Sequence, residues 1–255
     1  EQKNLKMINL EGKRILVTGA SSGIGKAFAQ QAASLGASLL LFGRNIERLK
    51  ATYNSLDGSG HEYHAFDITD YSTVEQVILH SVDNGQKING FVHCAGIEKT
   101  TPFKASKPEV FKEMFEINVF AAFEIARILS RKIVADPAGA SFVFLSSVKG
   151  KSGDPGKVAY CSSKSALLAG VRAMALELAG KKIRCNCVLP GIVNTPMTEK
   201  LFASVPSEAK QKIIESHPLG LGSPEDVSNL ICFLISDNAR WITGSEYIID
   251  GGYSA

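Results

Sequence analysis

The stretch Arg14-Ile15-Leu16-Val17-Thr18-Gly19-Ala20-Ser21-Ser22-Gly23-Ile24-Gly25 decides the fold of this 255-residue chain. Its first five residues form an apolar run with β-branched members, which favours a buried strand. Glycines stop this run, and residues of one helical face then recur at Ala27, Phe28, Gln31, Ala32 and Leu35. The stretch therefore predicts a strand, a glycine-rich turn and a helix.

Strand and helix patterns alternate along the rest of the chain. A second buried-type strand is predicted at 37–42, and further strands at 61–66, 88–94, 141–145, 183–189 and 247–249, with helical segments between them. Such alternation requires crossover connections, so it predicts a parallel sheet covered by helices on both faces. The sequence contains no linker, repeat or low-complexity segment, which favours a single domain over residues 1–255 with a loose lead-in at 1–13.

The composition argues against several classes of protein. Hydrophobic residues make up 45% and charged residues 21%, as in folded globular domains and unlike disordered chains. A net charge of +3 without a run of like charges gives no reason to expect a nucleic-acid or membrane surface. No apolar run approaches the length of about 18 residues that a membrane-spanning helix needs.

The sequence contains an odd number of cysteines and no C-x-x-C pair: Cys94, Cys161, Cys185, Cys187 and Cys232. We therefore expect reduced thiols, no metal site and a cytoplasmic protein. His61-x-x-His64 has a metal-like spacing but lacks a third ligand. Lys3 and Lys6 precede no apolar segment, so the first residues do not resemble a secretory signal.

The glycine-rich turn is a candidate phosphate site. A turn between a strand and a helix presents unpaired backbone N–H groups and a helix N-terminus, where the pyrophosphate of a dinucleotide binds. The spacing of Gly19, Gly23 and Gly25 differs from G-x-G-x-x-G. An ordinary strand-to-helix turn without a ligand therefore remains the alternative.

The choice of cofactor is expected to depend on the end of the second strand, Phe42-Gly43-Arg44. At this place an acid commonly binds the ribose 2′-hydroxyl, whereas an arginine accommodates a 2′-phosphate. This strand ends without a carboxylate, and the Arg44 guanidinium suits a phosphate. We expect NADP(H) to be preferred over NAD(H); the alternative is that Arg44 only begins the next helix in solvent.

The stretch Tyr160-Cys161-Ser162-Ser163-Lys164 opens a segment with helical periodicity. Residues four apart share one helical face, so the Tyr160 hydroxyl and the Lys164 ammonium point to one place. A nearby cation favours the phenolate and lowers the tyrosine pKa from ~10 toward neutral pH. Ser147 is a second hydroxyl that could hold a carbonyl oxygen. Alone, this spacing equally describes a half-buried tyrosine beside a solvated lysine.

Together, these motifs resemble the short-chain dehydrogenase/reductase family over nearly the whole chain. The matching residues are Thr18-Gly19-Ala20-Ser21-Ser22-Gly23-Ile24-Gly25, Asp67-Ile68, Ala95-Gly96, Asn118, Ser147, Tyr160, Lys164, Pro190-Gly191 with Thr195, and Asp250-Gly251-Gly252. The resemblance implies an α/β fold: a single doubly wound, Rossmann-like domain with a parallel sheet of strand order 3-2-1-4-5-6-7. It also implies hydride transfer between a nicotinamide and a carbonyl/secondary alcohol pair.

The same resemblance implies the roles of the site residues. Tyr160 is the general acid/base, Lys164 lowers its pKa and holds the nicotinamide ribose, and Ser147 binds the reacting oxygen. Asn118 supports a water that relays protons to the lysine. The implied cofactor contacts are Gly19, Ser21, Ser22, Gly23, Ile24, Gly25, Arg44, Asp67, Ile68, Cys94, Ala95, Gly96, Tyr160, Lys164, Pro190, Gly191, Val193 and Thr195.

The chain departs from the family pattern at two places. Cys94-Ala95-Gly96 stands where the family usually has Asn-Ala-Gly, which removes an amide from the site. Ser21-Ser22 supplies no basic residue to the turn, so Arg44 alone is left to bind a 2′-phosphate. The family also implies a homotetramer or homodimer, and the apolar helix predicted at 111–134 fits burial on two sides.

Residues 191–223 are a candidate substrate-binding loop region, because long excursions after a strand often form binding loops and lids. Apolar residues such as Met197, Leu201 and Phe202 either face a substrate or only pack the segment down. Lys149 and Lys151, shortly after Ser147, could bind a substrate carboxylate or phosphate, or be solvated.

The sequence gives only the class of substrate. His217-Pro218-Leu219-Gly220 and Ile242-Thr243-Gly244 resemble the 3-oxoacyl-carrier-protein reductase branch, but residues 97–103 lack the pattern of a dedicated fatty-acid reductase. We therefore expect an oxidoreductase for a small-molecule carbonyl or alcohol. The alternatives are the 3-oxoacyl-carrier-protein reductase of fatty-acid synthesis and a non-catalytic nucleotide-binding protein. Retention of all four catalytic residues argues against the second alternative.

Overall fold

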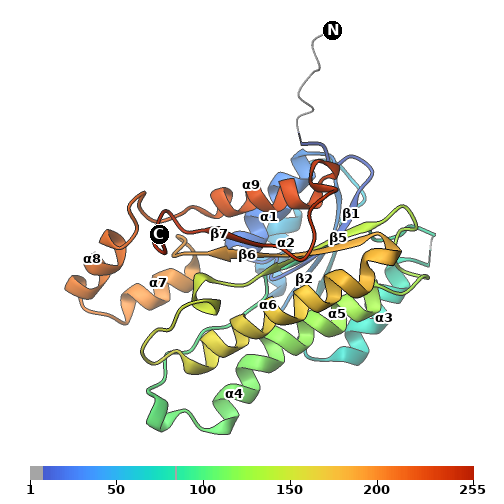
Figure 1. Cartoon of the computed structure of the whole chain (residues 1–255). Coiled ribbons are helices and arrows are strands. Elements are labelled where there is room, and N and C mark those ends of the chain that lie inside the picture. The colour runs from blue at the N-terminus through green and yellow to red at the C-terminus, as the bar shows by residue number, and fades with distance from the viewer. Residues whose placement is uncertain (1–7, 84) are drawn as a thin grey trace.

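The computed structural model describes residues 8–83 and 85–255, which build one parallel sheet of seven strands (Figure 1). In spatial order the strands are β3, β2, β1, β4, β5, β6 and β7. Their bounds are β1 Arg14–Thr18, β2 Ser38–Gly43, β3 Glu62–Ala65, β4 Gly90–His93, β5 Ala140–Leu145, β6 Ile183–Pro190 and β7 Glu246–Ile249. The predicted α/β doubly wound fold and its strand order are confirmed.

Helices cover both faces of the sheet (Figure 1). One face carries α1 (Gly23–Ser34), α2 (Ile46–Tyr53) and α9 (Pro224–Ile235). The other carries α3 (Tyr71–Ser81), α4 (Pro108–Phe115), α5 (Ala121–Leu129) and α6 (Val158–Leu178). Two further helices, α7 (Pro196–Ala203) and α8 (Ser207–Glu215), follow β6 and project beyond the sheet.

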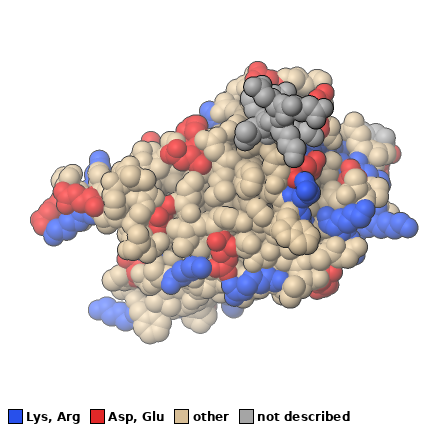
Figure 2. All heavy atoms as spheres, turned by 45° about the horizontal axis from the view of Figure 1, so that its top comes forward, with Lys and Arg blue, Asp and Glu red and all other residues tan. Residues whose placement is uncertain are grey.

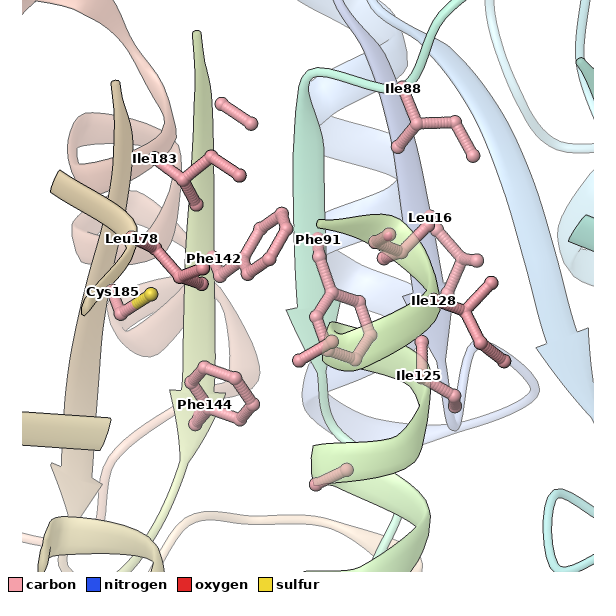
Figure 3. Packing of buried hydrophobic residues seen from close by; sticks show 14 of the residues in the cluster. Leu16, Ile88, Phe91, Ile125, Ile128, Phe142, Phe144, Leu178, Ile183 and Cys185 are labelled. Atoms are coloured by element: carbon pink, nitrogen blue, oxygen red, sulfur yellow. The ribbon is translucent and has the colours of Figure 1, made fainter. Parts of the chain in front are cut away.

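Aromatic side chains fill the core between the sheet and α5 and α6 (Figure 3). Phe91 of β4 packs edge to face against Phe142 and Phe144 of β5, with ring centres 5.7 and 5.6 Å apart. Ile125 and Ile128 of α5 close this cluster and are fully buried. Each such side chain contributes roughly 1.5–3 kcal/mol through burial. The packing therefore holds the ends of β4 and β5 in fixed positions beside the site.

Local signals set where α9 begins. The Ser223 hydroxyl accepts a hydrogen bond from the backbone N–H of Asp226 at 3.1 Å, and the Asp226 carboxylate accepts one from the Ser223 N–H at 2.7 Å. This capping box, with Pro224 at the first helical position, satisfies N–H groups that the helix itself leaves unpaired. The capping box also fixes the position of Ser223, the last residue of the 191–223 segment.

Three expectations from the sequence need correction. Leu10 is fully buried and its N–H bonds the carbonyl of Leu35, so the lead-in is packed from this residue on; residues 1–7, with Lys3 and Lys6, lie outside the described part. The helix predicted at 111–134 ends at Leu129. Residues 191–223 are not a continuous loop, because they contain the helices α7 and α8. The Thr195 side chain caps α7 by accepting a hydrogen bond from the N–H of Thr198.

The surface carries charges of both signs. On the face in Figure 2, basic and acidic side chains are interspersed over the described residues, without a continuous region of one sign. Within residues 8–83 and 85–255, no cluster of three His, Cys, Asp or Glu side chains has an arrangement that could hold a metal ion. None of the helices described there combines the length and hydropathy needed to span a bilayer.

Candidate active site

The predicted site residues gather at one edge of the sheet, where the parallel strands end. Gly19 follows β1, Arg44 follows β2, and Asp67 lies two residues beyond β3. Cys94 follows β4, and Ser147 lies two residues beyond β5. In open α/β sheets this carboxyl edge is where ligands bind, so the topology brings together residues that are far apart in sequence.

Helix α6 is fastened to the turn that carries Ser147. The Ser146 hydroxyl donates to the carbonyl of Lys164 at 2.9 Å, and the Ser165 hydroxyl donates to the carbonyl of Gly150 at 2.5 Å. A side chain at Gly150 would place its Cβ only 3.1 Å from the Lys164 carbonyl, so the close approach requires glycine. These contacts place the Ser147 side chain near enough to the Tyr160 hydroxyl to influence its pKa.

Tyr160 lies in a site that keeps its hydroxyl protonated. Burial raises the pKa of Tyr160, the hydrogen bond with Ser147 opposes this rise, and the charge of Glu98 adds to it. The sequence predicted the reverse, a pKa lowered by Lys164. In this structure burial is the largest effect on the Tyr160 pKa and acts in the opposite direction, and the Lys164 Nζ lies 5.8 Å from the centre of the tyrosine ring.

Lys164 itself is buried, with 5% of its surface exposed. Its Nζ donates a hydrogen bond to the carbonyl oxygen of Leu145 at 2.8 Å, which points the ammonium toward the end of β5. Burial lowers the pKa of Lys164 to about 8. The lysine is therefore able to gain and lose a proton near neutral pH, as a proton-relay group must.

Asn118 is fully buried in a π-helical turn, Glu116–Phe120, between α4 and α5. Its amide accepts a hydrogen bond from the N–H of Ile97 at 2.8 Å and donates to the carbonyl of Ile97 and the hydroxyl of Ser163, both at 3.0 Å. The wider turn departs from regular helix, a feature that often occurs at functional sites. Asn118 thus joins the segment after β4 to helix α6.

The glycine-rich turn has the shape of a dinucleotide cradle. A Cβ at Gly19 would lie 2.8 Å from the backbone nitrogen of Ala95, and one at Gly25 would lie 2.5 Å from the carbonyl oxygen of Gly19. Within the described chain the Ser22 side chain caps none of the first N–H groups of α1, which leaves them available to an anion. The residues present therefore fit a dinucleotide pyrophosphate.

Four of the predicted cofactor contacts lie together beyond the ends of β2 and β3, where the adenosine is expected. Asp67 accepts hydrogen bonds from the N–H and hydroxyl of Thr69, at 3.0 and 2.8 Å. The backbone hydrogen bond from Thr69 lowers the pKa of Asp67, and the nearby charge of Arg44 contributes to the shift. Arg44 is exposed, and Ile68 is buried beside Asp67. Ser21 lies close to this end too, since a Cβ at Gly43 would be 3.4 Å from its hydroxyl.

One of the two departures from the family pattern, Cys94-Ala95-Gly96, lies at the end of β4. The Thr18 hydroxyl accepts a hydrogen bond from the Ala95 N–H at 3.2 Å and pairs with Nδ1 of His93 at 3.0 Å. Burial lowers the pKa of His93 to about 3 and raises that of the Cys94 thiol to about 12. Both groups are therefore neutral at physiological pH, and they act in packing β1 against β4.

The residues after β6 return toward the glycine turn. A Cβ at Gly23 would lie 3.2 Å from the Thr195 methyl group, and a Cβ at Gly191 would lie 2.9 Å from Asp250. Val193 is buried and forms an isolated bridge with Gly222. Pro190, Gly191, Val193 and Thr195 therefore border the same site as the glycine turn.

Sequence reasoning missed three residues near the site: Glu98 and Lys157 beside Tyr160, and Tyr253 beside Lys149. The Lys157 ammonium pairs with the Glu98 carboxylate at 2.8 Å, and Tyr253 receives a hydrogen bond from Lys149 at 2.6 Å. Lys149 is thus already engaged, as is Lys151, which pairs with Glu246 at 2.8 Å. Only the position of Glu98, two residues after Gly96, was a signal that could have placed it at the site.

Comparison with known proteins identifies the family to which this chain belongs. A family model described as enoyl-(acyl carrier protein) reductase matches residues 19–254. A putative short-chain alcohol dehydrogenase from Sinorhizobium meliloti superimposes with a TM-score of 0.89 at 31% identity, covering 97% of this chain and 98% of that one. The chain belongs to the short-chain dehydrogenase/reductase family.

Members of this family from other organisms extend the match over the whole length. The 3-oxoacyl-(acyl-carrier-protein) reductase of Thermotoga maritima is 34% identical, covering 96% of this chain and 99% of the relative. A short-chain dehydrogenase/reductase from Mycobacterium ulcerans has a TM-score of 0.87 at 28% identity, covering 96% of this chain and 90% of that one. The chain is accordingly an NAD(P)-dependent oxidoreductase for carbonyl/alcohol pairs, in the branch that resembles 3-oxoacyl-carrier-protein reductases.

Proposed function

We propose that the protein reduces a small or medium-sized carbonyl substrate with NADPH, and that Tyr160 is the proton donor. The observation that carries this proposal is the placement of Tyr160 and Lys164 on α6, which hydrogen bonds fasten to the end of β5 and to the turn that carries Ser147. A nicotinamide bound beside them would supply the hydride. Residues 191–223 would bind the substrate, within one domain formed by residues 1–255.

The chain's own residues then perform the proton chemistry. As negative charge builds on the substrate oxygen, the Tyr160 and Ser147 hydroxyls donate hydrogen bonds to it, and Tyr160 gives up its proton. The raised pKa of Tyr160 keeps its hydroxyl protonated at neutral pH, so it can donate a proton during reduction. Lys164, with a pKa of about 8, is placed to return a proton to the tyrosine between turnovers.

We propose NADP(H) as the preferred cofactor. Arg44 directly follows β2, is exposed, and lies near enough to Asp67 to affect the pKa of that carboxyl. A guanidinium at this place suits a 2′-phosphate, and Ser21, beside Gly43, offers it a hydroxyl donor. The glycine turn and the N-terminus of α1 would hold the pyrophosphate.

The experiment for this proposal is steady-state oxidation of NADPH and NADH against a panel of acetoacetyl thioesters, sugars and diketones, with Tyr160→Phe alongside. We expect turnover that prefers NADPH and falls about 10²–10⁴-fold in the variant, as loss of a general acid requires. Preference for NADH would defeat the cofactor assignment. Cofactor binding without turnover of any carbonyl would instead support the non-catalytic alternative.

The second candidate is 3-oxoacyl-carrier-protein reductase. It is favoured by the full-length similarity to enzymes of that name in Thermotoga maritima and Aquifex aeolicus, at 34% and 33% identity. Activity on acetoacetyl thioesters that exceeds activity on small ketones would decide for it.

We further propose that the protein assembles as a homotetramer or homodimer. Phe120, in the π-helical turn before α5, is 50% exposed, and Leu176 of α6 is 84% exposed. Large apolar side chains on adjacent helices are typical of an isologous interface. Size-exclusion chromatography with light scattering tests this, and a monomer would refute it. A cytoplasmic location stays a prediction, which is based on free cysteines.

A further inference from the structure

Two oppositely charged side chains, Glu98 and Lys157, meet beside Tyr160. Their atoms are 2.8 Å apart, and the side chains are only 14% and 11% exposed. Glu98 belongs to the segment after β4, and Lys157 immediately precedes α6, three residues before Tyr160. The backbone N–H of Thr101 donates to the carbonyl of Gly156 at 2.8 Å, which fixes these two segments against each other. The Glu98–Lys157 pair is therefore held in one place.

The pair continues into a longer series of charged groups. The Asp154 carboxylate lies 3.8 Å from the Lys157 ammonium and 3.3 Å from that of Lys149. Lys149 in turn donates to the Tyr253 hydroxyl at 2.6 Å. Two lysines thus alternate with two carboxylates, so this wall is strongly polar but carries no net charge.

The Glu98–Lys157 end of the series lies beside Tyr160, because Lys157 precedes Tyr160 by three residues at the start of α6 and pairs with Glu98. The charge of Glu98 acts on the Tyr160 hydroxyl, adding to the rise that burial causes in its pKa. At the other end the Lys149 backbone N–H donates to the Ser147 hydroxyl at 3.2 Å. A substrate whose carbonyl reaches Tyr160 and Ser147 therefore places its neighbouring atoms against this charged wall.

We propose that the Glu98–Lys157 pair makes the site selective for neutral substrates with a hydroxyl group close to the reacting carbonyl; this inference rests on the proposed function. An alkyl substituent would exclude water from two largely buried charges and return no hydrogen bond. A substrate carboxylate would gain little, because Glu98 and Asp154 already neutralise the Lys157 ammonium, so the carboxylate would lose its hydration without a free cation to pair with. A hydroxyl can donate to the Glu98 carboxylate and accept from the Lys157 ammonium.

The test compares ketones that differ by one group, using NADPH and the wild-type protein. Hydroxyacetone and 2-butanone differ by a hydroxyl in place of a methyl, as do 1,3-dihydroxyacetone and 3-pentanone at two positions. The double variant Glu98→Gln/Lys157→Met removes both charges together and leaves neither buried alone. It also supplies the baseline for the greater intrinsic reactivity of the hydroxyketones.

We expect the hydroxyl preference in kcat/KM to fall by roughly 10- to 100-fold in the double variant, as for loss of a hydrogen bond to a charged group. Lys99→Met is the matched control. Lys99 also belongs to a lysine–glutamate pair, with Glu113, but both side chains are about half exposed, at 50% and 47%. It should leave the preference unchanged.

The outcomes separate the inference from the function on which it rests. Turnover of both kinds of ketone with the same hydroxyl preference in wild type and double variant would overturn the inference alone. So would faster turnover of levulinate than of 5-hydroxy-2-pentanone, since the first carries a carboxylate and the second a hydroxyl. No turnover of any carbonyl by protein that binds NADPH would overturn the proposed function and the inference together.

Discussion

The glycine-rich turn at residues 19–25 and the helical segment at residues 196–215, which begins directly after Thr195, are built in opposite ways. In the turn, backbone approaches backbone so closely that Cβ atoms at Gly19 and Gly25 would lie within 2.8 and 2.5 Å of neighbouring main-chain atoms. In the segment, Thr198 is the one buried residue of α7, and none of the described residues of α8 is buried.

We attribute this difference to the two tasks proposed for these regions, which are cofactor binding for the turn and substrate binding for the helical segment. A cofactor shared by many enzymes needs one fixed cradle, which close packing supplies. A substrate that differs between relatives is better served by a segment with few core contacts, which can change sequence or position at little cost in folding free energy. The first region should therefore be intolerant of mutation, and the second tolerant in stability but sensitive in specificity.

Gly25→Ala should have the largest effect on stability. Its methyl group would overlap the Gly19 carbonyl, which is backbone and cannot rotate away, so we expect a loss of roughly 3 kcal/mol in the free energy of unfolding. Urea denaturation without cofactor measures this. Gly180→Ala is the control, because the new Cβ would meet nothing within 4 Å, and it should be neutral or slightly stabilising.

Lys164→Met should abolish activity and still stabilise the protein at pH 7. Burial holds the folded-state pKa of Lys164 near 8, below its ordinary value of 10.5, so burying the charged form costs free energy. After allowing for the lost hydrogen bond to Leu145, we expect a gain of about 1–2 kcal/mol.

The pH dependence of that gain is the sharper measurement. Between pH 8 and 10.5 the unfolded chain binds more protons at Lys164 than the folded one, so wild-type stability rises with pH relative to the variant. Thermal denaturation of both proteins should show the advantage of Lys164→Met shrinking over this range. A variant that is less stable at pH 7, with a difference independent of pH, would contradict the assigned burial cost.

Arg44→Asp tests whether the residue that follows β2 sets the choice between NADPH and NADH. Removing the guanidinium and adding a carboxylate should lower the ratio of kcat/KM for NADPH to that for NADH by about tenfold or more. Arg48→Asp, at an exposed arginine one turn later in α2, should leave the ratio nearly unchanged. A ratio that Arg44→Asp does not alter would place the 2′-phosphate elsewhere.

Met197→Ala should have the smallest effect on stability. Met197 is 45% exposed on α7, so truncation should change the free energy of unfolding by less than about 0.5 kcal/mol. The KM for a carbonyl substrate should nevertheless change if residues 191–223 bind it. A large loss of stability with an unchanged KM would mean that Met197 supports the fold and does not contribute to substrate binding.

The sequence predicted the features that are encoded locally. The run from Arg14 to Thr18 matches β1, and the other six strands overlap the predicted strand segments. For β2, β4, β5 and β6 the reason is that burial on both faces of a parallel sheet leaves a continuous apolar pattern, whereas the edge strands β3 and β7 are only partly buried. Tyr160 and Lys164 were found because residues four apart share a helical face, and α6 begins at Val158. The strand order needed the family resemblance.

Features that depend on tertiary surroundings were not predictable in the same way. Glu98 and Lys157 are far apart in sequence, and their pairing follows from the contact between Thr101 and Gly156. The rise in the pKa of Tyr160 depends on burial, which the Tyr-x-x-x-Lys spacing does not encode. The π-helical turn at Asn118 interrupts an apolar pattern that reads as one continuous helix.

The central claim is that Tyr160 donates the proton in a carbonyl reduction driven by bound NADPH. The most direct measurement follows the alcohol formed from a ketone with NADPH deuterated at the transferring C4 position, by mass spectrometry, in wild type and Tyr160→Phe. The account predicts one deuterium on the carbinol carbon in the wild-type product and almost no product in the variant. Alcohol without deuterium, or equal labelled product from Tyr160→Phe, would contradict it.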